Sequence, residues 1–81
     1  MMWIVYILEC ADGSLYTGIT NDLERRLRAH ASGTGAKYTK RRGPFTVRYT
    51  ESLDNKGAAL QREAAIKALD RSAKVALLTS P

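Results

Sequence analysis

The sequence predicts a small α+β protein in which strands and helices follow one another in the order β-β-α-β-α-α. A continuous apolar run over residues 3–8 has the length of a strand and lacks polar alternation, which is typical of a strand covered on both faces. Helical periodicity appears in separate stretches later in the chain, between glycine-containing or polar breaks. Helices are therefore expected on both sides of the sheet.

The other elements are predicted from turn signals, caps and periodicity. They are a second strand at 15–19, antiparallel to the first across the turn at 11–14, a helix at 22–31, a strand at 45–51, a helix at 58–69 and a short helix at 70–78. Asn21 is the expected N-cap of the first helix, with Glu24 at its N3 position. A basic loop follows that helix and runs to Gly43 and Pro44.

Length and composition exclude several classes of protein. Eighty-one residues predict one domain, residues 1–81. Cys10 is the only cysteine and His30 the only histidine, which excludes an internal disulfide framework and a structural zinc site. No apolar run is long enough for a membrane span, and the N-terminus lacks the pattern of a signal peptide. The expected location is the cytoplasm.

The net charge of +5 is unevenly distributed. Residues 25–50 hold eight basic and no acidic residues, so the rest of the chain, with five bases and eight acids, carries −3. A basic middle third on a mildly acidic scaffold is typical of a protein with a phosphate-rich partner. The alternative is a solvated basic surface that aids solubility.

Two helices carry polar residues on their apolar sides. At 100° per residue, Arg26 and His30 fall in the same arc as the leucines of the first helix, whereas Arg25 falls opposite. In the next helix, Glu63 falls on the side of the apolar residues Ala59, Leu60 and Ile66. A carboxylate there is costly unless it is paired or bound to a cation. The plain alternative is an i,i+4 ion pair with Lys67.

The tyrosines complete a candidate site. Tyr6 lies in an otherwise apolar strand and needs a partner for its hydroxyl, although Tyr6 or Tyr16 alone is ordinarily a core or interface aromatic. With Arg26, His30 and Glu63, they would place two phenols, a guanidinium, an imidazole and a carboxylate around one gap. That set fits phosphodiester hydrolysis, in which arginine stabilises phosphoryl charge, a carboxylate holds Mg²⁺, and a phenol or imidazole handles the proton of water.

These residues also carry a family resemblance. Val5-Tyr6-Ile7, followed by Tyr16-Thr17-Gly18, resembles the paired motifs that name the GIY-YIG endonuclease superfamily. Arg26 matches the catalytic arginine of that family, and His30 a histidine of several branches. Residues 59–67 resemble the segment that supplies its metal-binding glutamate, here Glu63, and residues 35–44 resemble the loop of its small single-domain bacterial branch. The resemblance covers residues 3–78.

The resemblance implies a three-stranded antiparallel sheet flanked by helices and hydrolysis of DNA with one divalent cation, Mg²⁺ or Mn²⁺. It implies that Tyr6 contacts the attacking water, Tyr16 supports the site, Arg26 binds the scissile phosphate, Glu63 ligates the metal and His30 assists. The expected contacts to nucleic acid are Lys37, Tyr38, Lys40, Arg41 and Arg42. One departure is Ile19, where repair-type members carry a lysine near the phosphate.

Two functions remain open on the sequence. One is a metal-dependent endonuclease acting on DNA, with branched and single-stranded DNA among the candidate substrates. The other is a nucleic-acid-binding adaptor of the same fold that cleaves poorly and relies on a partner subunit for substrate choice.

The hairpin register gives a geometric requirement for the candidate site. A three-residue loop ending at Gly13, in the left-handed region as a G1-type bulge, pairs Tyr6 with Gly18 and Leu8 with Tyr16. A two-residue loop would put the two tyrosines on opposite faces of the sheet. With the first register, we expect Gly18 to leave room over the Tyr6 ring for water and phosphate. We also expect Arg26 and Glu63 to converge on that same face.

Overall fold

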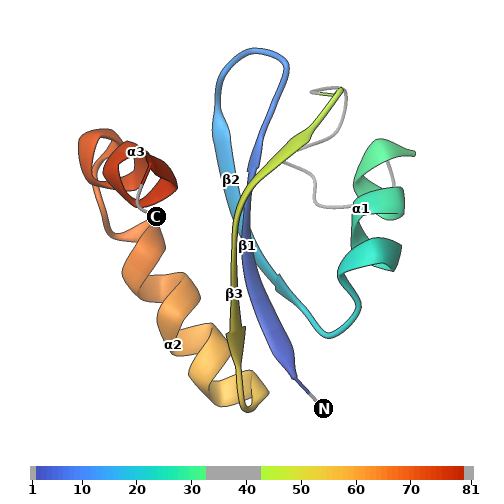
Figure 1. Ribbon diagram of the computed structural model, residues 1–81, viewed down its shortest axis with the longest axis vertical. Helices are drawn as coiled ribbons and strands as arrows, with labels where there is room; N and C mark the ends of the chain where they lie inside the picture. Colours follow the sequence, from blue (N-terminus) through green and yellow to red (C-terminus); the bar gives the residue numbers. More distant parts are fainter. Residues whose placement is uncertain (1, 33–42, 80–81) are drawn as a thin grey trace.

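The computed structural model describes residues 2–32 and 43–79, and within them the predicted elements occur in the predicted order (Figure 1). These elements are β1 (Trp3–Glu9), β2 (Leu15–Thr20), α1 (Leu23–Ala31), β3 (Thr46–Leu53), α2 (Lys56–Lys67) and α3 (Arg71–Thr79). The strands form one antiparallel sheet in the order β2-β1-β3. Helix α1 lies on one side of this sheet, and α2 and α3 lie on the other (Figure 1). The predicted fold class is confirmed.

Strand β1 is the central strand, and its sequence explains why. Residues 5–8 are each 0% exposed, with side chains that alternate between the two faces of the sheet. Val5 and Ile7 pack with Ala59 and Ile66 of α2, so the odd-numbered positions face α2 and α3. Tyr6 is on the other face, where it contacts α1. A strand with helices on both faces needs a continuous apolar run, as observed.

The core on the α2 side is completed by partly buried apolar residues. They are Trp3, Leu15, Ile19, Tyr49, Leu53, Leu77 and Leu78. Complete burial of a side chain such as Ile7 stabilises the fold by about 1.5–3 kcal/mol. Leu60, expected on the apolar side of α2, is instead 46% exposed. Among the described residues, no helix is long and apolar enough to cross a membrane.

The hairpin has the predicted register. Tyr6 pairs with Gly18, and Leu8 pairs with Tyr16. Gly13 has φ +83°, its N–H donates to the carbonyl of Cys10 at 2.9 Å, and the Cys10 N–H donates to the carbonyl of Ser14 at 2.8 Å. Positive φ is readily adopted by glycine, so this residue type sets the loop length. Both tyrosines therefore lie on the α1 face.

The start of α1 differs from the prediction by one residue. The N-cap is Asp22, whose carboxylate accepts the N–H of Arg25 at 3.1 Å, so the assignment to Asn21 was wrong. The cause lies in Thr20, whose hydroxyl accepts the Asp22 N–H at 3.0 Å and donates to the Asp22 carbonyl at 3.1 Å. This turn delays the helix by one residue, and Glu24 therefore does not occupy N3.

The later helices also differ slightly from the predicted bounds. Helix α2 begins at Lys56 because the Asn55 side chain accepts the N–H of Ala58 at 2.8 Å, two residues before the predicted start. Asp70 accepts the N–H of Ala73 at 2.8 Å and caps α3. Helix α2 packs against β1 and β2.

Candidate active site

Three side chains from β1 and α1 meet at the hydroxyl of Tyr6. Tyr6 Oη lies 2.8 Å from His30 Nε2, and it accepts a hydrogen bond from Arg26 Nε at 3.3 Å. Tyr6 is 0% exposed and His30 is 1% exposed, so the contact is closed to solvent. Arg26 is half-buried and Arg25 is exposed. The predicted orientation of α1, with Arg26 and His30 toward the sheet, is confirmed.

Aromatic rings surround this contact. The Tyr16 ring centroid lies 6.3 Å from that of Tyr6 and 5.3 Å from that of His30. Phe45, just before β3, packs its ring edge-on against His30 at 6.0 Å. Such tilted arrangements are the favoured geometry of aromatic pairs. Sequence reasoning missed the contact between Phe45 and His30, because the residue pattern of a strand does not show which distant side chain will pack against it.

Gly18 is required for the position of the Tyr6 hydroxyl. A Cβ atom at residue 18 would lie 2.6 Å from Tyr6 Oη and 3.0 Å from the Tyr16 ring. The expected open space for water and phosphate at this point was therefore wrong, because the phenol of Tyr6 itself fills it. The glycine allows the hydroxyl to reach His30 and Arg26.

Burial and charge shift the titration of this cluster. Burial raises the pKa of Tyr6, and the hydrogen bond from Arg26 lowers it less, so the phenol is protonated at neutral pH. The pKa of His30 is lowered, first by burial and second by the Arg26 charge, so the imidazole is neutral. The hydrogen bond to Tyr6 raises the pKa of Arg26, which remains a cation.

The lowered pKa of His30 predicts a pH dependence of stability. Unfolding exposes this histidine and restores a pKa of about 6.5, so the unfolded chain binds the proton more readily. The free energy of unfolding should therefore fall as the pH drops below about 6.5, by up to about 1.4 kcal/mol per pH unit. Urea denaturation between about pH 8 and pH 5 measures this, with His30→Gln as the control. An equal pH dependence of the free energy of unfolding in the wild type and in His30→Gln would contradict a lowered pKa of His30 in the folded protein.

Glu63 approaches the cluster from the other helix layer. Helix α2 packs on the face opposite the tyrosines, so the expectation that Glu63 converges with Arg26 on one face of the sheet was wrong (Figure 1). Hydrophobic periodicity had indicated which side of α2 is buried, but not which face of the sheet it covers. The Glu63 charge nevertheless acts on Tyr6, since it is among the causes that raise the pKa of that phenol.

The surroundings of Glu63 bear on metal binding. Its side chain is 19% exposed, and Lys67 Nζ lies 3.5 Å from its Oε2, so the i,i+4 pair is present. Within residues 2–32 and 43–79, no group of three or more His, Cys, Asp or Glu side chains is placed to hold a metal ion. Mg²⁺ commonly binds through one or two carboxylates and keeps waters and substrate phosphates as its other ligands. Glu63 fits that mode, and the described side chains do not fit an all-protein cage.

The structure does not describe the basic residues predicted to contact nucleic acid. Outside the described residues lie Lys37, Tyr38, Lys40, Arg41 and Arg42.

A second polar cluster, which sequence reasoning missed, lies on the α2 face of the sheet. Glu51 accepts hydrogen bonds from Tyr49 at 2.8 Å and from Arg62 at 2.9 Å. Those two hydrogen bonds satisfy the carboxylate and lower the pKa of Glu51. We therefore interpret it as a structural connection between β3 and α2.

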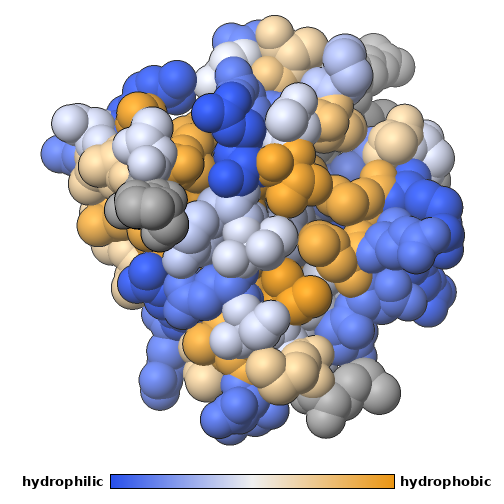
Figure 2. Space-filling view, viewed as in Figure 1, coloured by the Kyte–Doolittle hydropathy of each residue, from blue (hydrophilic) through white to orange (hydrophobic). Residues whose placement is uncertain are grey.

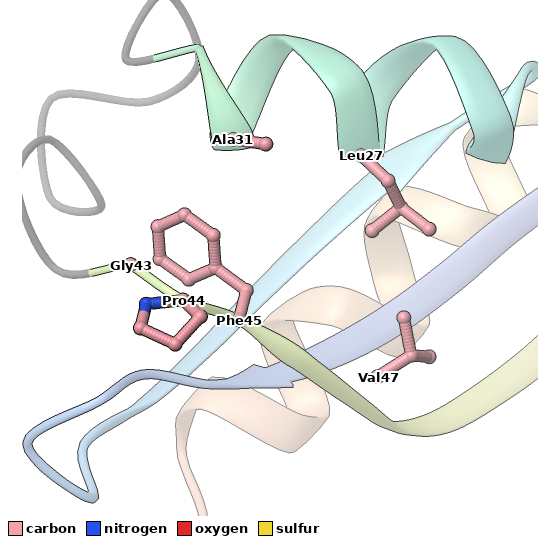
Figure 3. Close-up of a pocket in the computed structure, with 6 residues that line it drawn as sticks. All are labelled: Leu27, Ala31, Gly43, Pro44, Phe45 and Val47. Atoms are coloured by element: carbon pink, nitrogen blue, oxygen red, sulfur yellow. The ribbon is translucent and has the colours of Figure 1, made fainter.

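An apolar pocket of about 500 Å³ opens beside His30. Leu27 and Ala31 point into it from α1, and Phe45 and Val47 line the opposite side (Figure 3). Figure 2 shows apolar side chains gathered between the sheet and the hydrophilic outer surface of α1. No acidic or basic residue lines this pocket among those described, so the polar chemistry belongs to the neighbouring Tyr6 cluster.

The sequence was compared with protein families and with known relatives, and both comparisons match nearly the whole chain. A family model described as the GIY-YIG catalytic domain matches residues 2–76. A UPF0213 protein of Halobacterium salinarum is 53% identical over 73 residues, which cover 90% of this chain and 95% of that protein. A UPF0213 protein of Oceanobacillus iheyensis is 55% identical over 74 residues, covering 91% of this chain and 86% of that protein.

Two solved structures are similar over nearly the whole chain. The solution NMR structure of a UPF0213 protein from Bacillus halodurans has a TM-score of 0.64 at 49% identity, with 98% of this chain and 84% of that chain covered. The solution NMR structure of a protein from E. faecalis has a TM-score of 0.66 at 43% identity, with 98% and 85% covered. The α+β arrangement is thus shared with experimental structures.

Proposed function

We propose that this chain, which belongs to the GIY-YIG catalytic-domain family, is a divalent-metal-dependent endonuclease that hydrolyses DNA phosphodiester bonds by attack of water. Family membership supports a nuclease-type function on nucleic acid. The observation that carries the finer proposal is the Tyr6 hydroxyl held between the Arg26 guanidinium and the His30 imidazole. The guanidinium can stabilise charge on the phosphoryl oxygens, and the phenol and imidazole can accept and pass on the proton of water; hydrolysis of a phosphodiester requires both.

Arg26 is assigned to the scissile phosphate. The guanidinium has five N–H donors, and the hydrogen bond to Tyr6 uses the one on Nε. Its other donors form a planar fork that matches the oxygens of a phosphate. Because the phenol and the helix hold the guanidinium in place, little reorganisation is needed when charge develops on the phosphoryl oxygens.

Tyr6 and His30 are assigned to the proton of the attacking water. Tyr6 Oη accepts from Arg26, so we assign its own proton to the neutral Nε2 of His30. Because Tyr6 is fully buried, we propose that DNA binding first opens its hydroxyl to the attacking water. As that water attacks the phosphorus atom, its proton passes to Tyr6 Oη while the Tyr6 proton passes to His30 Nε2. The lowered pKa of His30 keeps this nitrogen free of a proton at neutral pH. Tyr16 packs against both rings and holds their orientation.

Glu63 is assigned as the protein ligand of one Mg²⁺ or Mn²⁺ ion. A divalent cation bound there would act as a Lewis acid on a phosphoryl oxygen and stabilise the leaving oxygen. Lys67 Nζ lies 3.5 Å from Glu63 Oε2, so the ammonium offsets part of the carboxylate charge when no cation is bound. One carboxylate leaves the remaining coordination positions to water and to the substrate.

A plasmid-nicking assay tests the proposed activity and separates it from the adaptor alternative. Supercoiled plasmid should convert to the relaxed form with protein and Mg²⁺ or Mn²⁺. Nicking should stop with EDTA and return when excess cation is restored. An adaptor of the same fold would shift DNA in a gel but leave the plasmid intact under every one of these conditions.

The basic segment between α1 and β3 is proposed to track the DNA backbone. Neutralising Lys40, Arg41 and Arg42 together should weaken DNA binding and lower the salt dependence of log Kd by about 3, since each lost phosphate contact removes about 1. Fluorescence anisotropy with a labelled duplex between about 0.05 and 0.2 M salt measures both. Unchanged affinity and slope in the triple variant would remove this segment from the interface.

A further inference from the structure

We propose that a cleft between β2 and the α2–α3 corner binds a backbone phosphate of DNA next to the scissile one, an inference that rests on the proposed function. The cleft has a volume of about 370 Å³. It is lined by Leu15, Tyr16, Thr17, Lys67 and Lys74. Two lysines from different helices thus share one hollow with the second tyrosine of the candidate active site.

The charge of the cleft favours an anion. Lys67 is the last residue of α2, and Lys74 lies in the first half of α3, so the bend between the helices brings both to one side of β2. No acidic residue lines the cleft among the residues described. Glu63 compensates part of the Lys67 charge at 3.5 Å, but it is itself the proposed cation ligand. That contact uses one of the three N–H donors of the Lys67 ammonium and leaves the others for a DNA phosphate, with or without a bound cation.

The backbone of β2 adds donors to the same place. Strand β2 is an edge strand, and the Cys10 N–H donates to the Ser14 carbonyl at the end of the hairpin. In an antiparallel ladder, residues alternate between hydrogen-bonded and non-hydrogen-bonded pairs. Counting from the Cys10–Ser14 pair, the N–H groups of Leu15 and Thr17 point away from β1, toward the outer edge where the cleft lies. Backbone N–H groups with two ammonium groups suit phosphate oxygens.

The cleft also lies at the right place relative to the proposed chemistry. Tyr16 lines it and packs against Tyr6 and His30. Lys67 is one helical turn beyond Glu63, so their Cβ atoms are about 5–6 Å apart on the same face of α2. A DNA strand with its scissile phosphate at Arg26 can therefore continue past Tyr16, around the edge strand β2, into the cleft. Lys67 and Lys74 would position the DNA strand through its phosphates, independently of the base sequence.

The test compares DNA binding by the whole chain and by variants of the two lysines. A labelled oligonucleotide duplex is titrated in EDTA, and the salt dependence of log Kd is measured by anisotropy. The double variant Lys67→Gln with Lys74→Gln should bind about tenfold more weakly at about 0.05 M salt, and its slope should fall by about 2. Replacing both lysines with arginine should restore the wild-type slope. Either glutamine change alone should lower the slope by about 1, which tests the proposal even if the double variant fails to fold.

Lys56→Gln is the matched control, since Lys56 lies at the other end of α2 with its ammonium 5.4 Å from the Trp3 ring centroid. Its slope should equal that of the wild type. A slope for the lysine variants equal to that of Lys56→Gln would overturn the phosphate site, whatever the plasmid assay shows. Saturable binding of inorganic phosphate, with no change in the DNA slope, would assign the cleft to a small anion and also overturn it. If the slope falls but the wild type never nicks plasmid, the proposed hydrolysis fails and the phosphate site stands.

Discussion

Replacing Arg26 with alanine should lower plasmid cleavage by at least about 10²–10³-fold, the usual cost of removing one preorganised group that stabilises developing charge. Arg26 is the one cation bonded to the Tyr6 phenol in the described structure, through its Nε at 3.3 Å. The fold should remain intact, because Arg26 is half-buried at the edge of α1 and its loss opens no apolar cavity. Tyr6 would still keep its contact with His30.

Arg25→Ala is the control for this change. Arg25→Ala removes the same charge from the same turn of α1, but the Arg25 side chain is exposed. Cleavage rates by Arg25→Ala should stay within a few-fold of the wild type, and thermal unfolding should show both variants folded. Equal losses of activity from the two variants would mean that general basic charge, and not the contact at Tyr6, supports cleavage.

Gly18→Ala should destabilise the fold by about 1–3 kcal/mol and reduce activity more than any surface change. The added Cβ would stand 2.6 Å from Tyr6 Oη and 2.8 Å from Tyr6 Cζ, closer than folded proteins tolerate. Tyr6 is fully buried in the central strand, so its ring cannot move away without disturbing packing. The hydroxyl should then lose its alignment with His30 and Arg26.

Gly57→Ala provides the comparison, because its added Cβ would meet only the end of the Asn55 side chain, at 3.3 Å. In the first turn of a helix, alanine is also favoured over glycine by about 0.5–1 kcal/mol. Urea denaturation should show Gly57→Ala within about 0.5 kcal/mol of the wild type or slightly more stable. A Gly18→Ala protein with wild-type stability and activity would show that the Tyr6 hydroxyl is not confined as described.

The features predicted correctly are those that a simple repeat determines. The apolar run of β1 indicated two covered faces, and the loop ending at Gly13 determined the pairing of Tyr6 with Gly18. The 3.6-residue repeat of α1 placed Arg26 and His30 toward the sheet. Each of these depends on local geometry, which the order of residue types determines directly.

The features that were missed depend on contacts between distant segments. Asn21 and Asp22 are equally suitable as N-cap by residue type. The hydrogen bond between the Thr20 hydroxyl and the Asp22 backbone makes Asp22 the N-cap in the structure. The side of the sheet on which α2 packs decides where Glu63 lies, and no periodicity encodes it. The Phe45 contact with His30 likewise joins residues brought together only by the tertiary fold.

The most direct test of a hydrolytic site built around Tyr6 and Glu63 is the rate of Mg²⁺-dependent plasmid nicking by wild type and Glu63→Ala, measured side by side. Glu24→Ala is the control, because it removes a carboxylate whose side chain is 84% exposed on α1. We expect nicking by wild type and Glu24→Ala at similar rates and none above background by Glu63→Ala, with all three proteins folded by circular dichroism. Nicking by Glu63→Ala at the wild-type rate would contradict the proposed site.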